Sequence, residues 1–409
     1  MSAPGSAPAG HRVPAPDVAR GLMLWVIAVA NVTAWIWAPG STGGLRDRTR
    51  GAGAGAAGWT PDDVVNVAMS MLVDGRGFPL FSLLVGYGVG QIAAREAARG
   101  TPPPLAQGLL LRRYGWLLLI GALHACLLFP GDIVTAYACG GLALALLVTA
   151  STRLLVVLAA LGSVLMVLYG GLSWVVREPG VPSFPSLVAD TAGQRLVLGA
   201  GEGLLVVLLA PIQLLGLLPM LLLGLALSRH RVLEDPGPRR ARLLGAAAAG
   251  IGLGLLTGAG TGLLTTGMLE PSAAAGMLLT GADAVTGAAQ GIGYALVVAL
   301  VCDRALRRRG APAQRPVPTA REHPVLWSLQ ALGRRSLSGY LAQSVLFTVL
   351  MPPFALGLGR ALDPVPALLL GTVVWLLTLA GAVLLERRGR AGPAEALHRR
   401  LHAGARTSS

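Results

Sequence analysis

Apolar stretches long enough to cross a bilayer recur along almost the whole of this 409-residue chain. The first runs from Val18 to Ala38, and its strongly polar members are Arg20 and Asn31. A helix needs ~20 apolar residues to cross the hydrocarbon core of a membrane. Only 13% of the residues are charged, about half the share of ~25% in a soluble domain. The sequence therefore predicts an all-α polytopic membrane protein whose surroundings are the lipid bilayer of the cell membrane.

The spacing of the apolar runs predicts about ten transmembrane helices joined by short loops. A short surface or re-entrant helix is expected to start at Thr60-Pro61 and to end at a break at Asp74-Gly75-Arg76-Gly77. The expected organisation is a disordered cytoplasmic tail, a transmembrane helical domain and a cytoplasmic C-terminal tail, at residues 1–15, 16–390 and 391–409. The expected spans are residues 18–38, 78–94, 109–129, 133–150, 154–176, 200–228, 243–268, 275–303, 325–350 and 364–386.

Arginines are concentrated in alternate loops and account for much of the net charge of +14. Because positive loops face the cytoplasm, both termini are expected there. A nucleic-acid partner is not expected, since the arginines lie between apolar runs and not on a soluble basic face. The arginine-rich segments are 95–113, 229–242, 304–324 and the C-terminal tail, and the arginine-poor loops are 130–132, 269–274 and 351–363. The first outer loop, with Arg46, Arg48 and Arg50, departs from the pattern.

Ionisable and amide side chains inside spans are costly, so each is a candidate functional residue. Arg20 and Asn31 are eleven residues apart, close to three helical turns, and therefore project from one face of the first span. Asp17 lies one turn before Arg20. The structural alternative is an arginine that reaches the interface and an asparagine that bonds to a neighbouring helix.

A second candidate site lies at the outer end of the third span. The tight turn at Pro130-Gly131 would bring the carboxylate of Asp132 to the imidazole of His124, fixing its tautomer and raising its basicity. Asp74 and Arg76 are expected at the same membrane face. The alternative is a histidine at a helix end and an aspartate that caps the next helix.

The ninth span carries a polar stripe that starts beside Arg334. Its members are Ser336, Tyr340, Gln343 and Ser344, at helical spacing on one face. Such a stripe lines a cavity or forms hydrogen bonds between helices. By contrast, the glycines at 250, 254, 258 and 262 predict close helix packing. No metal-ligand spacing or cofactor motif is visible, so no metal or bound cofactor is expected.

Several of these pieces, in this order and spacing, resemble the YeiB-like family of bacterial membrane proteins, domain of unknown function 418. The matching pieces are Asp17-x2-Arg20-Gly21 with Asn31, Asp74-Gly75-Arg76-x2-Pro79-Leu80-Phe81-Ser82, Gly121-x2-His124-x5-Pro130-Gly131-Asp132, Gly333-Arg334-x-Ser336-Leu337 and Gly392-Pro393-x-Glu395. The family is similar, more remotely, to membrane acyltransferases. In the acyltransferase-three group, the first span carries an arginine and, after ten intervening residues, a histidine. Here Asn31 takes that place, and an amide cannot accept a proton as an imidazole does.

The resemblance favours an acyltransferase-like protein that moves an acyl group from cytoplasmic acyl-coenzyme A (acyl-CoA) to an envelope acceptor. The donor phosphates would bind Arg20, Arg334 and Arg113, since a guanidinium suits phosphate. His124 would act as the base and Asp132 would orient it. Two rivals stand beside this hypothesis: a transporter or exporter that uses the polar stripe as its path, and a non-catalytic membrane scaffold. The sequence leaves the oligomeric state, the substrate and the acceptor open.

Overall fold

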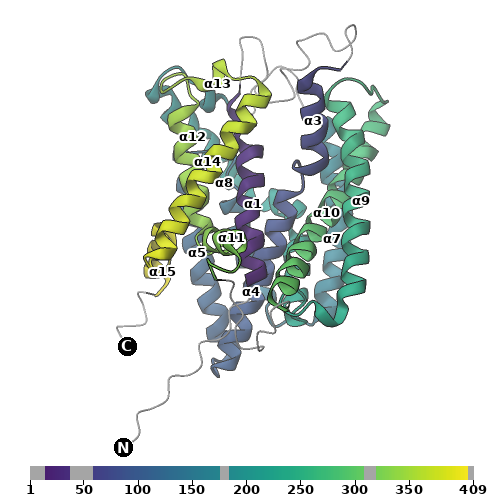
Figure 1. Ribbon diagram of the computed structural model, residues 1–409, viewed down its shortest axis with the longest axis vertical. Helices are drawn as coiled ribbons and strands as arrows, with labels where there is room; N and C mark the ends of the chain where they lie inside the picture. The colour runs from purple at the N-terminus through teal and green to yellow at the C-terminus, as the bar shows by residue number, and fades with distance from the viewer. Residues whose placement is uncertain (1–13, 37–58, 176–183, 308–318, 404–409) are drawn as a thin grey trace, which may run out of the picture.

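A computed structural model describes residues 14–36, 59–175, 184–307 and 319–403. Every regular element in these ranges is helical (Figure 1). The expected N-terminal tail and the arginines at positions 46, 48 and 50 lie almost entirely outside them. The elements are α1 (Pro14–Val32), η1 (Thr33–Trp35), α3 (Pro61–Leu72), α4 (Gly77–Ala98), α5 (Pro103–Leu127), α6 (Val134–Leu147), α7 (Thr152–Val175), η2 (Pro185–Val188), α8 (Ala192–Arg229), η3 (Gly237–Arg239), α9 (Arg240–Thr265), α10 (Ala273–Arg307), α11 (Pro324–Gly333), α12 (Ser336–Leu350), α13 (Leu358–Ala361), α14 (Pro364–Arg387) and α15 (Pro393–Ala403).

Eight segments of the described chain are long and apolar enough to cross a membrane. Two of the ten expected spans, residues 133–150 and 325–350, correspond instead to the shorter apolar helices α6 and α12. The all-helical membrane class is therefore confirmed, and the number of long candidate spans is eight.

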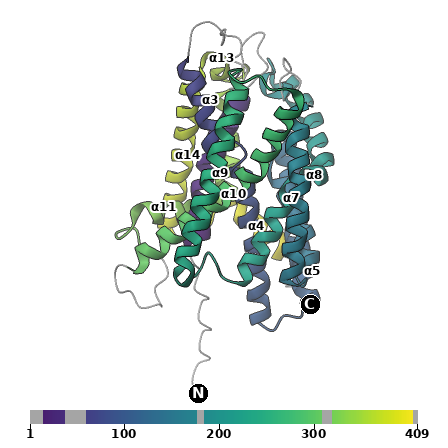
Figure 2. The same cartoon turned by 90° about the vertical axis from the view of Figure 1, so that its right-hand side faces the viewer.

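Two expected elements differ in the structure. The short helix expected as a surface or re-entrant helix is α3, which begins within the Thr60–Asp63 capping box. It packs along α9 in the upper half of the bundle and so does not lie apart from the other helices (Figures 1 and 2). The expected break is present, with Gly75 at φ +73°, and the chain continues through it into α4. The span expected at 325–350 is instead interrupted at Arg334–Arg335, between α11 and α12.

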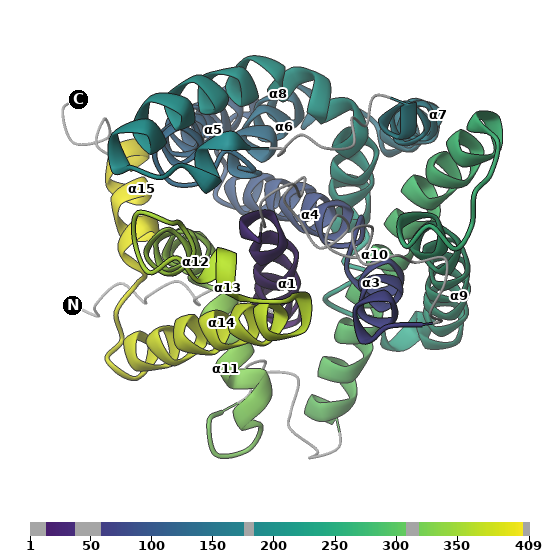
Figure 3. The same ribbon diagram turned by 90° about the horizontal axis from the view of Figure 1, so that it is seen from above.

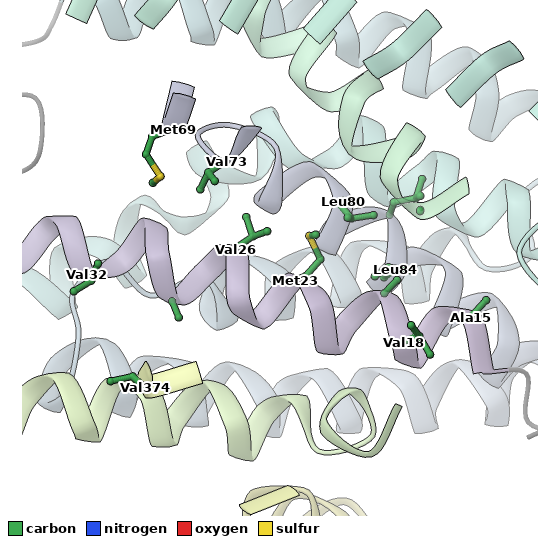
Figure 4. Packing of buried hydrophobic residues seen from close by; sticks show 14 of the residues in the cluster. Ala15, Val18, Met23, Val26, Val32, Met69, Val73, Leu80, Leu84 and Val374 are labelled. Atoms are coloured by element: carbon green, nitrogen blue, oxygen red, sulfur yellow. The ribbon is translucent and has the colours of Figure 1, made fainter. Parts of the chain in front are cut away.

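Helix α1 lies at the centre of the bundle, packed against α4, α10, α11, α12 and α14 (Figure 3). Its apolar face belongs to the largest core cluster, in which Met23 and Val26 lie next to Val73 and Leu80 (Figure 4). Close approach of α11 depends on Gly333, because a Cβ there would overlap with the carbonyl oxygen of Asp17. The polar start of α1, with Asp17 and Arg20, and the start of the polar stripe beside Arg334 thus lie together at the centre of the bundle.

The glycine stripe of α9 packs as expected. A Cβ at Gly250 would meet the backbone of Ala289 on α10, and one at Gly262 would meet Val67 on α3. Side chains at these positions would push the neighbouring helices away. The close packing of α9 against α10 and α3 confirms the structural interpretation of the stripe.

One end of the bundle carries most of the arginines of the described helix ends, and we call it the basic end. There α4 ends and α5 begins, and there α8 ends and α9 begins (Figure 1). The start of α1 and the helix α15 also lie at this end. The other end of the bundle is called the opposite end. The arginines of the basic end include Arg95, Arg112, Arg113, Arg229, Arg239, Arg240 and Arg390.

Candidate functional site

The imidazole of His124 is held between a carboxylate and a hydroxyl near the opposite end of the bundle. Its Nδ1 lies 2.8 Å from Oδ1 of Asp132, and its Nε2 lies 2.8 Å from Oγ of Ser344. All three residues are buried, with exposed fractions of 3% each. The predicted contact between His124 and Asp132 is therefore confirmed, and the structure adds Ser344 from the polar stripe.

Local structure explains why Asp132 takes this position. Helix α5 ends at Leu127, and the Pro130–Gly131 turn reverses the chain so that α6 begins at Val134. The second oxygen of Asp132 accepts hydrogen bonds from the backbone N–H and the hydroxyl of Thr135, at 2.7 and 2.6 Å. Asp132 is thus both a helix cap and the partner of the imidazole, which leaves its carboxylate fixed in orientation.

The hydrogen-bond partners also assign the tautomer of His124. A carboxylate can only accept, so Nδ1 of His124 donates to Asp132. Nε2 then carries a lone pair that accepts the hydroxyl proton of Ser344. This arrangement of hydroxyl, imidazole and carboxylate is the one that general-base activation of an oxygen nucleophile requires.

Tyr340 separates the His124 cluster from a large cavity. Its ring packs against the imidazole at a centroid distance of 4.9 Å, and its exposed fraction is 3%. The hydroxyl lies near the Ile133 backbone, yet it makes no hydrogen bond of normal geometry within the described chain. Gln343 donates to the carbonyl of Leu24 at 3.2 Å, which ties the stripe to α1. Most buried hydroxyls have a hydrogen-bond partner. The hydroxyl of Tyr340 is an exception among the described residues, so its proton can be donated to a ligand in the cavity.

The cavity has a volume of about 1040 Å³ and extends from the basic end toward the His124 cluster. At its inner end it is lined by Ile133, Val134, Tyr137 and Tyr340, and Ile133 directly follows Asp132. Eight arginines and four carboxylates line it, which leaves an excess of four positive charges. The arginines are Arg20, Arg95, Arg113, Arg231, Arg334, Arg335, Arg390 and Arg399. An anionic ligand that enters from the basic end is therefore favoured.

Most of the predicted substrate-binding residues line this cavity: Asp17, Arg20, Arg113, Arg334, Ser336 and Tyr340. Arg20 donates to Asp17 at 2.8 Å and to the carbonyl of Leu84 at 3.2 Å. Arg334 pairs with Glu386 at 3.1 Å. Asn31 does not line the cavity; it is half-buried in the last turn of α1. The first span therefore contributes Arg20 to the cavity but not its asparagine.

Arg76 and Asp74 lie in a different cluster from His124. Arg76 is 1% exposed and forms a bidentate salt bridge with Asp283 of α10, with N···O distances of 2.7 and 3.0 Å. It also donates to the side chain of Gln290 and to the carbonyls of Gly254 and Asp74. Arg76 and His124 therefore belong to separate clusters, because the donors of Arg76 are used to join α9 and α10 to the break between α3 and α4.

Two carboxylates with defined partners were not among the candidate site residues. Asp283 was not among the candidate residues, although a lone carboxylate in an apolar span calls for a cationic partner. Glu395 was noted only within a motif. Its carboxylate accepts from the backbone N–H groups of Leu337 and Ser338, at 2.9 and 3.1 Å, and so caps the start of α12.

Comparison with known proteins gives a family match for the second half of the chain. Residues 227–405 match the family described as "Protein of unknown function (DUF418)". This part of the chain matches the DUF418 family. It is also 26% identical over 343 residues to "Uncharacterized protein YxaH" of Bacillus subtilis (strain 168), across 78% of this chain and 77% of that one. The resemblance inferred from the motifs is thereby confirmed, and neither match carries an assigned reaction.

The C-terminal helix of the DUF418 match, α15, forms part of the wall of the cavity at the basic end. Glu395, His398 and Arg399 of this helix line the cavity. His398 is buried, and its Nε2 lies 2.8 Å from the carbonyl oxygen of Arg113, so it donates to α5. Helix α15 therefore connects the start of α12 to α5 across the entrance.

Docking of α15 is expected to weaken in acid. Burial lowers the pKa of His398 from 6.5 to about 4. The hydrogen bond to the Arg113 carbonyl opposes this shift, and the charges of Arg113 and His402 add to it. The docked imidazole is neutral, so its contribution is complete above pH 6.5 and is lost as the pH falls toward 4. Hydrogen exchange of residues 393–403, corrected for intrinsic rates, should rise over that range. The variant His398→Phe, which cannot titrate, should show a smaller rise, and an equal rise in both proteins would contradict the assignment.

Proposed function

We propose that this protein transfers an acyl group from cytoplasmic acyl-CoA to an acceptor on the outer side of the cell membrane. The observation that carries the proposal is the arginine-lined cavity whose inner end meets Tyr340, which packs on His124. The proposal takes the basic end as cytoplasmic, following the positive-inside rule, with both termini on that side.

The basic end suits the phosphate groups of coenzyme A. Arg20 and Arg334 line the cavity, and each guanidinium has more donors than its partners among the described residues use. The cavity volume of about 1040 Å³ lies at the upper end of the range of ~300–1,000 Å³ for ligand pockets, which suits a large ligand. The thioester would then lie at the inner end, beside Tyr340.

The inner end suits acyl transfer. His124 has a fixed tautomer and a lone pair on Nε2, and Asp132 stabilises the imidazolium that forms when a proton is accepted. The remote similarity to membrane acyltransferases adds to this argument. Since Asn31 cannot act as a base and does not line the cavity, His124 takes that role in the proposal.

Binding of coenzyme A to detergent-purified protein tests the donor site. We expect micromolar affinity that falls about 10- to 100-fold in Arg20→Ala, because a charge-assisted hydrogen bond contributes ~1.5–3 kcal/mol. Arg99→Ala is the matched control, since Arg99 is exposed directly after the last residue of α4 and does not line the cavity. Calorimetry at two salt concentrations measures both variants, and binding should weaken with salt.

If the wild-type protein, Arg20→Ala and Arg99→Ala all fail to bind coenzyme A, the assignment of the cavity as the donor site is refuted. Transport would then be the better interpretation, since discontinuous helices such as α3 and α4 occur at transporter sites. In that case, vesicles containing the protein should accumulate substrate in response to membrane potential and form no covalent product. Equal loss of binding in Arg20→Ala and Arg99→Ala would show that the effect does not arise in the cavity.

A further inference from the structure

Ser344 has the geometry of an activated nucleophile. Its hydroxyl lies 2.8 Å from Nε2 of His124, whose Nδ1 is held by Asp132, which is held in turn by Thr135. A serine hydroxyl reacts with an acyl donor only when a neighbouring base removes its proton. We infer that Ser344 carries the acyl group as an ester between donor and acceptor, an inference that rests on the proposed acyl transfer.

The hydroxyl of Ser344 differs from that of a serine with a purely structural role in a helix. Such hydroxyls usually donate to the carbonyl one turn earlier. Thr348, one turn further along α12, does so at 2.8 Å from the carbonyl of Ser344. For Ser344 the corresponding distance to the Tyr340 carbonyl is 3.4 Å, and the shorter contact is the one to His124. The proton of Ser344 is therefore directed at the imidazole.

The surroundings of Ser344 place it next to the donor cavity. Tyr340, one turn earlier on the same face of α12, lines the inner end of the cavity and covers the imidazole. A rotation of this ring would open the His124 cluster to a thioester in the cavity. The Tyr340 hydroxyl, which has no partner of normal geometry in the described part of the chain, would then donate to the thioester carbonyl oxygen, where negative charge develops.

The reaction balances in two steps. Oγ of Ser344 attacks the thioester carbonyl carbon, its proton passes to Nε2 of His124, and the carbon–sulfur bond breaks. The thiolate takes that proton and leaves as coenzyme A. In the second step an acceptor hydroxyl or amine attacks the ester, loses its proton to His124, and the proton returns to Oγ of Ser344 as that bond breaks. The covalent stage lets the donor leave by the basic end before the acceptor reacts.

Trapping the ester tests the inference. Purified full-length protein is incubated with isotope-labelled acetyl-CoA and no acceptor, quenched in acid, digested and analysed by mass spectrometry. We expect an acetyl group on Ser344, none in Ser344→Ala, and an unchanged amount in the control Thr348→Val. The variant S344C should acquire a thioester at the same position that neutral hydroxylamine removes, which keeps the test valid if Ser344→Ala fails to fold.

The outcomes separate the inference from the proposed function. If Ser344→Ala transfers label from acetyl-CoA to envelope acceptors at the wild-type rate, or if the label sits on another residue, the serine ester is overturned and acyl transfer stands. The same holds if the wild-type protein transfers label and rapid quenching detects no ester. If the wild-type protein binds no acetyl-CoA, releases no coenzyme A and labels no acceptor, the proposed function fails and the inference with it.

Discussion

The variant Arg76→Met should lose about 3 kcal/mol of stability, because it leaves the carboxylate of Asp283, which is only 15% exposed, without its charge partner. Arg76 is 1% exposed, and all three of its guanidinium nitrogens have acceptors on the neighbouring segments. Loss of the arginine also removes the link that holds the break between α3 and α4 against α9 and α10. Thermal unfolding of detergent-purified protein, followed by circular dichroism, measures the effect.

Two matched variants isolate the buried charge as the cause. Arg99→Met removes an arginine from an exposed pair with Glu96, where such pairs contribute about 0–1 kcal/mol. The double variant Arg76→Met/Asp283→Leu removes both charges and should regain much of the lost stability, since no unpaired charge remains. If Arg76→Met is as stable as the wild-type protein but loses ligand binding, Arg76 belongs to a substrate site after all.

The variant His124→Gln should lower acyl transfer by about 10²–10⁴-fold while coenzyme A binding changes less than about twofold. Glutamine can still bond to Asp132 and Ser344, so the packing of α5, α6 and α12 is retained. It cannot accept and return a proton at neutral pH. Release of labelled acetyl groups to envelope acceptors measures transfer, and calorimetry measures binding.

The control for this variant is His230→Gln, which replaces an exposed histidine at the end of α8 and should leave both quantities unchanged. A transfer rate in His124→Gln equal to that of the wild-type protein would refute the role of His124 as base. A parallel loss of binding and transfer would indicate damage to the fold and would be visible as a lower unfolding temperature.

Features that depend on neighbouring residues were predictable from the sequence. The apolar runs define the helices, since each buried or lipid-facing helix needs a continuous apolar stretch. The contact between His124 and Asp132 follows from a tight turn that joins residues only eight positions apart. The capping box at Thr60 and the glycine packing of α9 likewise follow from the spacing of residues that are close together in the sequence.

The site as a whole was decided by the tertiary structure. Ser344 meets His124 across 220 residues, and Arg76 meets Asp283 across 207. Three of these four side chains, His124, Ser344 and Arg76, were candidates from the sequence, and Asp283 was not. The sequence did not indicate which side chains would pair. The division of the ninth span at Arg334–Arg335 was also missed, although α11 must end there to pack on α1 through Gly333.

The physical reason lies in the range of the interactions. Hydropathy and turn chemistry act over a few residues, so the sequence by itself determined the helical membrane class, most helix positions and the hairpin between His124 and Asp132. Which helices lie side by side is fixed by the packing of many surfaces at once, together with the need to pair each buried polar group. Only that packing brought α12 to α5, opened the arginine-lined cavity and placed Tyr340 between the cavity and His124.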